Sequence, residues 1–138
     1  MKQLMILFLA IFALAACEKP TVGFLDVKNA AFTPDTLEIR TVLDPKKDAN
    51  REKNQAPWVS GAIQSVLGTK VYEFVRVTST AGEEAASLFA SELKVYGNSR
   101  MEVPLQPAAP KGSYRITLKV RNEGYSALLP DIFTFIIK

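Results

Sequence analysis

The feature that most restricts the fold is an alternating run near the C-terminal end of the sequence. From Tyr114 to Arg121, apolar side chains at even positions alternate with polar or charged side chains at odd positions. Neighbouring residues of a β-strand point to opposite faces of a sheet, so this period of two predicts a strand with one buried and one solvated face. The run Phe133-Thr134-Phe135-Ile136-Ile137 predicts a final strand after a loop that holds residues 122–125.

Shorter strand-like runs precede this pair. They lie at residues 24–27, 36–42, 72–78, 94–96 and 101–105. Pro104 has no amide hydrogen, so the strand that contains it must end there or lie at a sheet edge. Residues 81–93 place alanine, leucine and phenylalanine at helical spacing, which predicts one or two helical turns capped by Ser79 or Thr80. About seven short strands and one short helical crossover predict an all-β fold of the β-sandwich class.

The first sixteen residues have the composition of a bacterial signal peptide. Lys2 supplies a positive charge, and the uncharged apolar stretch from Leu4 to Ala16 is too short to span a bilayer. The stretch ends Leu14-Ala15-Ala16-Cys17, which resembles the lipobox of bacterial lipoproteins. The resemblance implies that the Cys17 thiol receives a diacylglycerol group before cleavage. An ordinary secretory leader followed by an unmodified cysteine is the alternative.

Two further observations favour lipidation. Cys17 is the single cysteine of the chain, so no intramolecular disulfide accounts for it. Several acyl chains, palmitate among them, on one N-terminus give stable membrane anchoring where a single chain is marginal. Glu18 follows the cysteine, in place of the aspartate that lipoprotein sorting rules associate with retention in the inner membrane. We therefore expect a lipid anchor in the outer membrane, with the cell surface as a candidate location.

Composition excludes several classes of function. The sequence contains no histidine, and its only thiol is assigned to lipidation. Ser-His and Cys-His catalytic pairs and histidine-ligated zinc sites are therefore excluded. Acidic and basic residues are interspersed at a net charge of +3, so no basic field indicates nucleic acid. We expect no enzymatic activity, no metal, no cofactor and no nucleic-acid partner.

Residues 44–57 differ from the rest of the sequence because they are rich in charge and almost free of apolar side chains. A solvated, mobile connection between strands is one interpretation. A contact surface for a partner protein is the other.

Aromatic side chains are the remaining candidates for binding. Sugars present C–H faces that stack on exposed rings, and their hydroxyls need amide, carboxylate or guanidinium partners. Trp58 and Tyr125 are the candidate platform, with Asn122 or Arg121 as hydrogen-bond partners. The alternative for Trp58 is a core position between two sheets. Three tyrosines within strand patterns are predicted to be packing residues: Tyr72, Tyr96 and Tyr114.

The residues of the last two strands resemble a known module. The run from Gly112 to Gly124, which contains Gly-Ser-Tyr-Arg-Ile-Thr-Leu and ends Asn-Glu-Gly, leads into Asp131-Ile132-Phe133-Thr134-Phe135-Ile136. This order resembles the last hairpin of PKD-like and cadherin-like immunoglobulin modules. Such modules occur near the N-termini of bacterial surface glycan-binding lipoproteins, after a lipobox, and Trp58 ahead of Ile63 and Gly68 is similar to that group. The resemblance implies an immunoglobulin-like β-sandwich.

These observations predict three segments: a signal peptide at 1–16, a lipidated tether at 17–23 and a sandwich domain at 24–138. The resemblance implies a non-enzymatic envelope lipoprotein that binds a surface glycan or acts as a spacer in a polysaccharide-capture system. The alternative is a protein-interaction module, anchored at the outer membrane, that docks on other envelope proteins through a strand edge or through residues 44–57.

Overall fold

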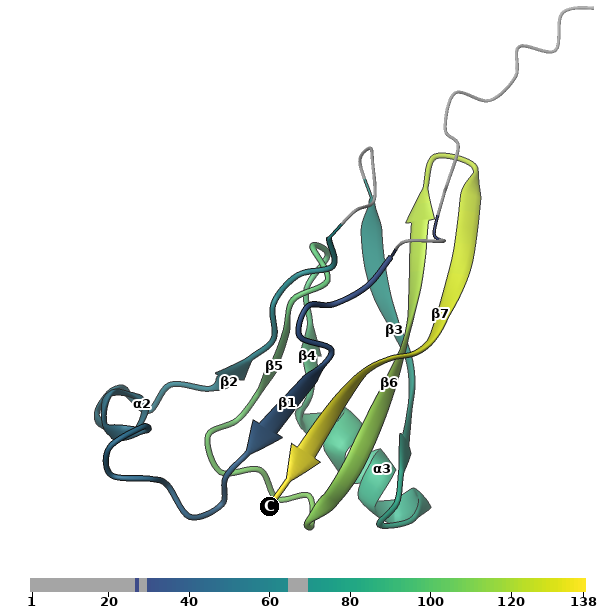
Figure 1. Cartoon of the computed structure of the whole chain (residues 1–138). Helices are drawn as coiled ribbons and strands as arrows, with labels where there is room; N and C mark the ends of the chain where they lie inside the picture. Colours follow the sequence, from purple (N-terminus) through teal and green to yellow (C-terminus); the bar gives the residue numbers. More distant parts are fainter. Residues whose placement is uncertain (1–26, 28–29, 65–69) are drawn as a thin grey trace, which may run out of the picture.

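A computed structural model describes residue 27, residues 30–64 and residues 70–138. The predicted signal peptide, Cys17, the tether and most of the strand predicted at 24–27 lie outside the described residues. Within the described ranges, seven strands form two sheets and two short helices connect them, which confirms the predicted β-sandwich at the level of its layers (Figure 1). No helix in this part of the chain is long and apolar enough to cross a membrane.

The larger sheet has four strands in the order β1-β7-β6-β3. Their bounds are Thr36–Ile39 for β1, Val71–Ser79 for β3, Gly112–Asn122 for β6 and Tyr125–Ile137 for β7. Strand β1 runs parallel to β7, whereas β7, β6 and β3 pair antiparallel. The strand predicted at 133–137 is only the second half of β7. A tight turn at Gly124 (φ +96°) allows β7 to pair with β6 from Tyr125 onward.

The smaller sheet has three strands in the order β2-β5-β4, all antiparallel. Their bounds are Trp58–Val59 for β2, Lys94–Val95 for β4 and Met101–Val103 for β5. Strand β5 ends immediately before Pro104, as the missing amide hydrogen predicts. We call the surface of each sheet that points away from the other sheet its outer face.

The alternation from Tyr114 to Arg121 builds the core as predicted. Side chains of Tyr114, Ile116, Leu118 and Val120 are fully buried and belong to one apolar cluster that takes residues from both sheets. Thr117, which points to the outer face, is also fully buried. The cause is a bulge in β7, where Asp131 adopts φ +47° and its backbone N–H donates to the Thr117 hydroxyl at 3.1 Å.

The predicted helical crossover is α3, Glu83–Glu92, which joins β3 to β4. It packs through Phe89, whose ring stacks on Tyr114 at 4.3 Å between centroids. The predicted caps are wrong: the N-cap is Gly82, at φ +102° and without a side-chain capping bond. Ser79 and Thr80 instead accept from backbone amides in the turn before the helix and at the start of β6.

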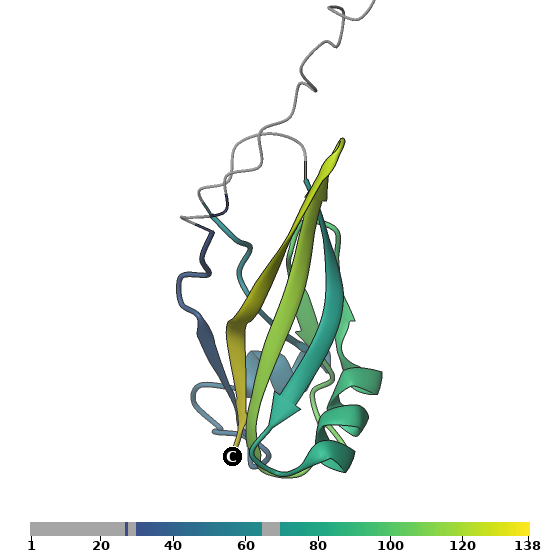
Figure 2. The same cartoon turned by 90° about the vertical axis from the view of Figure 1, so that its right-hand side faces the viewer.

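The described chain begins toward the end of the sandwich that carries the β6–β7 turn, and Lys138 lies at the opposite end (Figures 1 and 2). The last residue is held there by backbone bonds, because Lys138 N–H donates to Ile39 and Thr41 N–H donates to Lys138. The start of the described chain and its last residue therefore lie toward opposite ends of the long axis of the sandwich.

Candidate functional site

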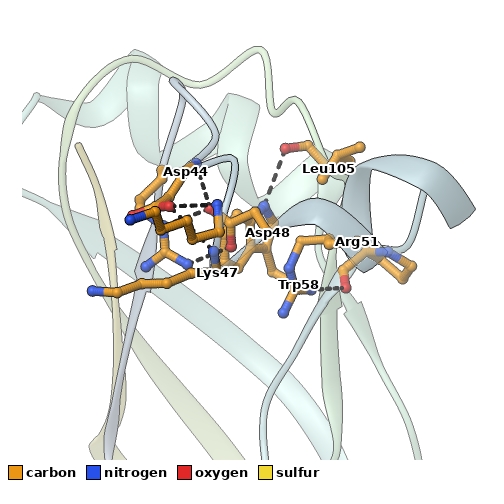
Figure 3. A network of polar contacts seen from close by, with 9 residues as sticks. Asp44, Lys47, Asp48, Arg51, Trp58 and Leu105 are labelled. Atoms are coloured by element: carbon orange, nitrogen blue, oxygen red, sulfur yellow. Dashed lines mark hydrogen bonds and ion pairs between the residues drawn. The ribbon is translucent and has the colours of Figure 1, made fainter.

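Trp58 lies in the core, with 2% of its surface exposed. Its indole N–H donates to the Leu105 carbonyl at 3.1 Å. The guanidinium carbon of Arg51 lies 4.1 Å from the ring centroid, and that of Arg40 lies 5.3 Å away. Figure 3 shows Trp58 with Asp48, Arg51 and Leu105 close by. We name Arg40, Asp48, Arg51 and Trp58 the Trp58 cluster. A ring covered in this way cannot stack on a sugar, so the structure favours the core interpretation of Trp58.

Asp48 organises the Trp58 cluster. Its side chain is 1% exposed, and its carboxylate accepts two bonds from the Arg40 guanidinium, the Nε–Oδ2 bond measuring 2.8 Å. The same carboxylate accepts the backbone N–H of Asp44 at 2.9 Å. The bonds from Arg40 and then from Asp44 lower the pKa of Asp48 from 3.8 to about 2. Both bonds favour the ionised form, so Asp48 is a structural anion at neutral pH.

Most side chains of residues 44–57 are exposed, as the interpretation of a solvated connection expects, but hydrogen bonds fasten the segment to the sandwich. The segment contains the helix α2, Ala49–Asn54, and is fastened to the end of β1 by the Arg40–Asp48 ion pair. Arg51 adds a bond from Nη1 to the Pro57 carbonyl at 2.6 Å. Two of the charged residues in the segment, Asp48 and Arg51, therefore hold it in place, which its local composition does not indicate.

The β6–β7 hairpin separates the other predicted binding residues. Asn122 and Tyr125 lie directly opposite each other at the end of the hairpin and share one face, with Tyr125 44% exposed. Arg121 lies on the other face, where its Nε donates to Glu73 at 2.7 Å. Trp58 lies on β2, in the three-stranded sheet rather than in the sheet of the hairpin (Figure 1). The predicted platform is therefore divided, and only its Tyr125–Asn122 part is brought together.

A different surface is hollowed: the outer face of the three-stranded sheet. A shallow depression of about 510 Å³ lies there, which we name the Tyr96 depression. Its lining residues come from β2, β5 and the turn between β4 and β5: Val59, Tyr96, Gly97, Asn98, Arg100 and Glu102. The set combines one aromatic ring, one carboxylate, one guanidinium and one amide.

Tyr96 is the aromatic wall of the depression, and 44% of its surface is exposed. Its hydroxyl donates to Glu102 Oε2 at 2.9 Å, which orients the ring and raises the pKa of Tyr96. The prediction that Tyr96 is a packing residue is wrong. Its backbone N–H pairs with the Arg100 carbonyl just beyond β4, so its side chain shares the outer face with Lys94 and Glu102.

The turn that carries Asn98 and Arg100 is held by one internal hydrogen bond and by two bonds to other segments. Ser99 is buried at φ +75°, and its hydroxyl accepts the Ile63 backbone N–H at 2.7 Å. The side-chain oxygen of Asn98 accepts the Arg100 backbone N–H at 3.1 Å. The Gly97 carbonyl accepts the backbone N–H of Tyr72, in β3 of the other sheet, at 3.1 Å. The rim of the depression is thereby built before any ligand arrives.

The arrangement has the chemistry of a saccharide subsite. A pyranose ring can lay its C–H face on Tyr96, and its hydroxyls can donate to Glu102 and accept from Arg100 or the Asn98 amide. One negative and one positive side chain at the rim balance each other, which suits an uncharged sugar. No group of three or more metal-ligating side chains occurs in the part of the chain that the structure describes. Local sequence signals for this site were weak: a tyrosine and a glutamate on either side of a Gly-Asn turn.

Comparison with known proteins supports the fold. No protein-family model matches the sequence, and no curated protein matches it. Among solved structures, the chain is similar to part of a SusE-like surface-located polysaccharide-binding protein from the heparin utilisation locus of Bacteroides thetaiotaomicron, with a TM-score of 0.55. The two sequences are 12% identical over 78% of this chain, and the match spans 15% of the length of that protein. This likeness shows a shared β-sandwich fold.

Proposed function

We propose that this protein is a non-enzymatic lipoprotein of the bacterial envelope that binds an uncharged glycan at the Tyr96 depression. The observation that carries the proposal is the exposed Tyr96 ring, oriented by its bond to Glu102 within a preformed hollow. An aromatic face beside a few fixed polar groups is the common composition of a carbohydrate site. The similar fold in a surface-located polysaccharide-binding protein supports the same class of ligand.

We assign the sandwich to the immunoglobulin-like class of PKD type. Support comes from the strand order, with β1 added parallel to β7 at the edge of an antiparallel sheet. Further support comes from Tyr114, whose hydroxyl donates to the Pro110 carbonyl just before β6. A tyrosine near the start of the penultimate strand that bonds back to the preceding corner is a hallmark of immunoglobulin-like sandwiches.

The same module also suits a spacer. Lipidation at Cys17 would attach the protein to the outer membrane at the end where the described chain begins, and Lys138 lies at the far end of the sandwich (Figure 1). A domain oriented this way holds its distal surfaces away from the bilayer. Glycan binding and spacing are compatible, since the Tyr96 depression is on the outer face of a sheet along the side of the sandwich.

A protein-docking role is the second candidate, and an exposed edge favours it. Strand β3 is an edge strand, and it exposes Val71, Phe74 and Val75 beside a bulge. Apolar side chains on an edge strand are typical of strand-addition sites, although the Tyr72 N–H of this edge already donates to the Gly97 carbonyl. Residues 44–57 are a weaker candidate, because their internal bonds already satisfy Asp48 and part of Arg51.

Affinity gel electrophoresis with a panel of uncharged polysaccharides tests glycan binding. We compare the wild type with Tyr96→Ala and with Tyr125→Ala, a matched control because both rings are 44% exposed. The proposal expects retardation of the wild type that Tyr96→Ala abolishes and Tyr125→Ala retains. Loss of retardation in Tyr125→Ala but not in Tyr96→Ala would show that the glycan binds at the β6–β7 hairpin instead. An unretarded wild type would leave only the spacer and docking roles.

Metabolic labelling with palmitate tests the anchor. Lipidation of Cys17 predicts label in the wild type, and a Cys17→Ala protein that is unlabelled and released from membranes. A Cys17→Ala protein that stays in the membrane fraction would contradict the proposed anchor without touching the proposal for the Tyr96 depression.

A further inference from the structure

The outer face of the four-stranded sheet carries a row of positive side chains that the proposed function does not use. They come from β3 and β6, and we name them the basic strip: Arg76, Arg115, Lys119 and Arg121. Strand register places them together. Arg76 lies opposite Thr117, Arg115 opposite Thr78, and Lys119 opposite Glu73, and side chains opposite each other in a sheet share a face.

Three of the four side chains of the basic strip are exposed in the part of the chain that the structure describes. Helix α3 packs through Phe89 against Tyr114, on the inner side of the same sheet, and so leaves the outer face open. Arg76, Arg115 and Arg121 are exposed, and Lys119 is half-buried.

The positive charge of the strip is only partly balanced. Glu73 accepts the Arg121 Nε–H at 2.7 Å and also lies opposite Lys119, so one carboxylate serves two cations. Asp131, whose backbone bonds to Thr117 at the bulge in β7, is the second carboxylate near the strip. Arg76 and Arg115 have no ion-pair partner among the described residues. Four cations against two carboxylates leave a positive surface.

The spacing of the positive charges along β6 indicates an extended ligand. A strand rises about 3.4 Å per residue, so Lys119 lies about 7 Å from Arg121 and about 14 Å from Arg115 along β6. A row of this length on a rigid sheet fits an extended polymer with repeated negative groups better than a single small anion. Hydroxyls opposite Arg115 on the two neighbouring strands add hydrogen-bond partners for a polysaccharide: Thr78 and Thr134.

We propose that the basic strip binds a linear anionic polysaccharide, with sulfate or carboxylate groups on successive sugars. Single-stranded nucleic acid is disfavoured because it is held by aromatic rings on which bases stack, and the residues opposite the strip include no aromatic side chain. The inference is independent of the Tyr96 depression, which lies on the other sheet and has balanced charges.

Binding of the full-length protein to dextran sulfate and to unsulfated dextran tests the proposal, since the two polymers share one glucose backbone and differ in its sulfate groups. The strip variant is Arg76→Gln/Arg115→Gln/Lys119→Gln. The control is Lys46→Gln/Lys47→Gln/Lys53→Gln, which removes the same charge from exposed positions of the 44–57 segment. We expect the wild type to bind dextran sulfate in a salt-sensitive manner and to ignore dextran.

The strip variant should bind dextran sulfate about ten-fold more weakly, whereas the control should stay within about two-fold. Glu73→Gln should bind more tightly, because it removes the carboxylate between Lys119 and Arg121, and a gain of affinity cannot come from misfolding. Equal losses in the two triple variants, or no binding of dextran sulfate by the wild type, would overturn the proposal. Duplex DNA bound as tightly as dextran sulfate would also overturn it.

Discussion

The Trp58 cluster and the Tyr96 depression are built on the same small sheet and have opposite properties. In each, an aromatic ring meets charged side chains, yet Trp58 is 2% exposed and Tyr96 is 44% exposed. Trp58 lies opposite Val103 and faces the core, whereas its neighbour Val59 lies opposite Glu102 and lines the depression. Adjacent positions of one strand thus supply the two regions. The side of the sheet decides whether an aromatic residue with charged neighbours stabilises the fold or stays free to bind.

The charged groups also differ in what they accomplish. In the Trp58 cluster, Arg40 and Asp48 satisfy each other and close the 44–57 segment over the ring. In the depression, the Tyr96–Glu102 bond is exposed, and a ligand hydroxyl can add to it. The comparison predicts that changes in the cluster alter unfolding and changes in the depression alter binding. The four substitutions below test this, from the largest expected effect on stability to the smallest.

Trp58→Ala should destabilise the protein most, by about 3–5 kcal/mol, because it empties a large core position. Urea unfolding followed by circular dichroism measures the loss. Trp58→Phe, which keeps a ring but loses the bond to Leu105, should cost less. A loss below about 1 kcal/mol for Trp58→Ala would show that the ring is not a core element.

Asp48→Asn should give the next largest loss at neutral pH, because it removes the charge that Arg40 and the Asp44 amide bind. The pKa of Asp48 is lowered to about 2, so its contribution is complete above its ordinary pKa of 3.8 and is lost as the pH falls through about 2. Urea midpoints from pH 5 to pH 2 should converge for wild type and variant. A gap that stays constant over this range would contradict the role of the ionised carboxylate.

Arg51→Gln should cost about 1 kcal/mol, since it removes the guanidinium 4.1 Å from the Trp58 ring and its bond to Pro57. Lys53→Gln, an exposed position on the same helix α2, is the matched control and should leave the urea midpoint unchanged. Equal effects of the two substitutions on the urea midpoint would show that Arg51 stabilises the fold no more than an exposed residue of α2 does.

Tyr96→Ala should change stability by less than about 0.5 kcal/mol, because the ring is half exposed and its bond to Glu102 is at the surface. The same variant should lose retardation by an uncharged polysaccharide. If it unfolds as readily as Trp58→Ala, the contrast between the two regions fails and Tyr96 is a packing residue after all.

The sequence predicted those strands and helices whose position depends on the pattern of neighbouring residues. The alternation from Tyr114 to Val120 predicted the central strand β6, and Pro104 predicted the end of β5. Spacing of apolar residues predicted α3 within residues 81–93. The caps of α3 were wrong, because Thr80 bonds to Ser113 across the sheet, a partner that the local pattern does not contain.

The candidate site was predicted less well, for a physical reason. The local hairpin brings Tyr125 and Asn122 together. Arg121 is separated from them because neighbouring residues of β6 point to opposite faces, and Trp58 is separated because it lies on the second sheet. Tyr96 and Glu102 meet only because β4 and β5 pair across a turn whose Ser99 is held by Ile63. Whether these aromatic and polar residues bind glycan stays a prediction.

The sequence by itself determined which side chains of each strand share a face, because the backbone period of two is a local property. It also determined the strand-rich fold class and the absence of histidine chemistry. Only the tertiary structure decided which face is covered, since burial depends on where the other sheet and the 44–57 segment pack. Because of that packing, Trp58 is buried and Tyr96 is exposed. The same packing brings Asp48 to Arg40, and their ion pair holds the 44–57 segment in place.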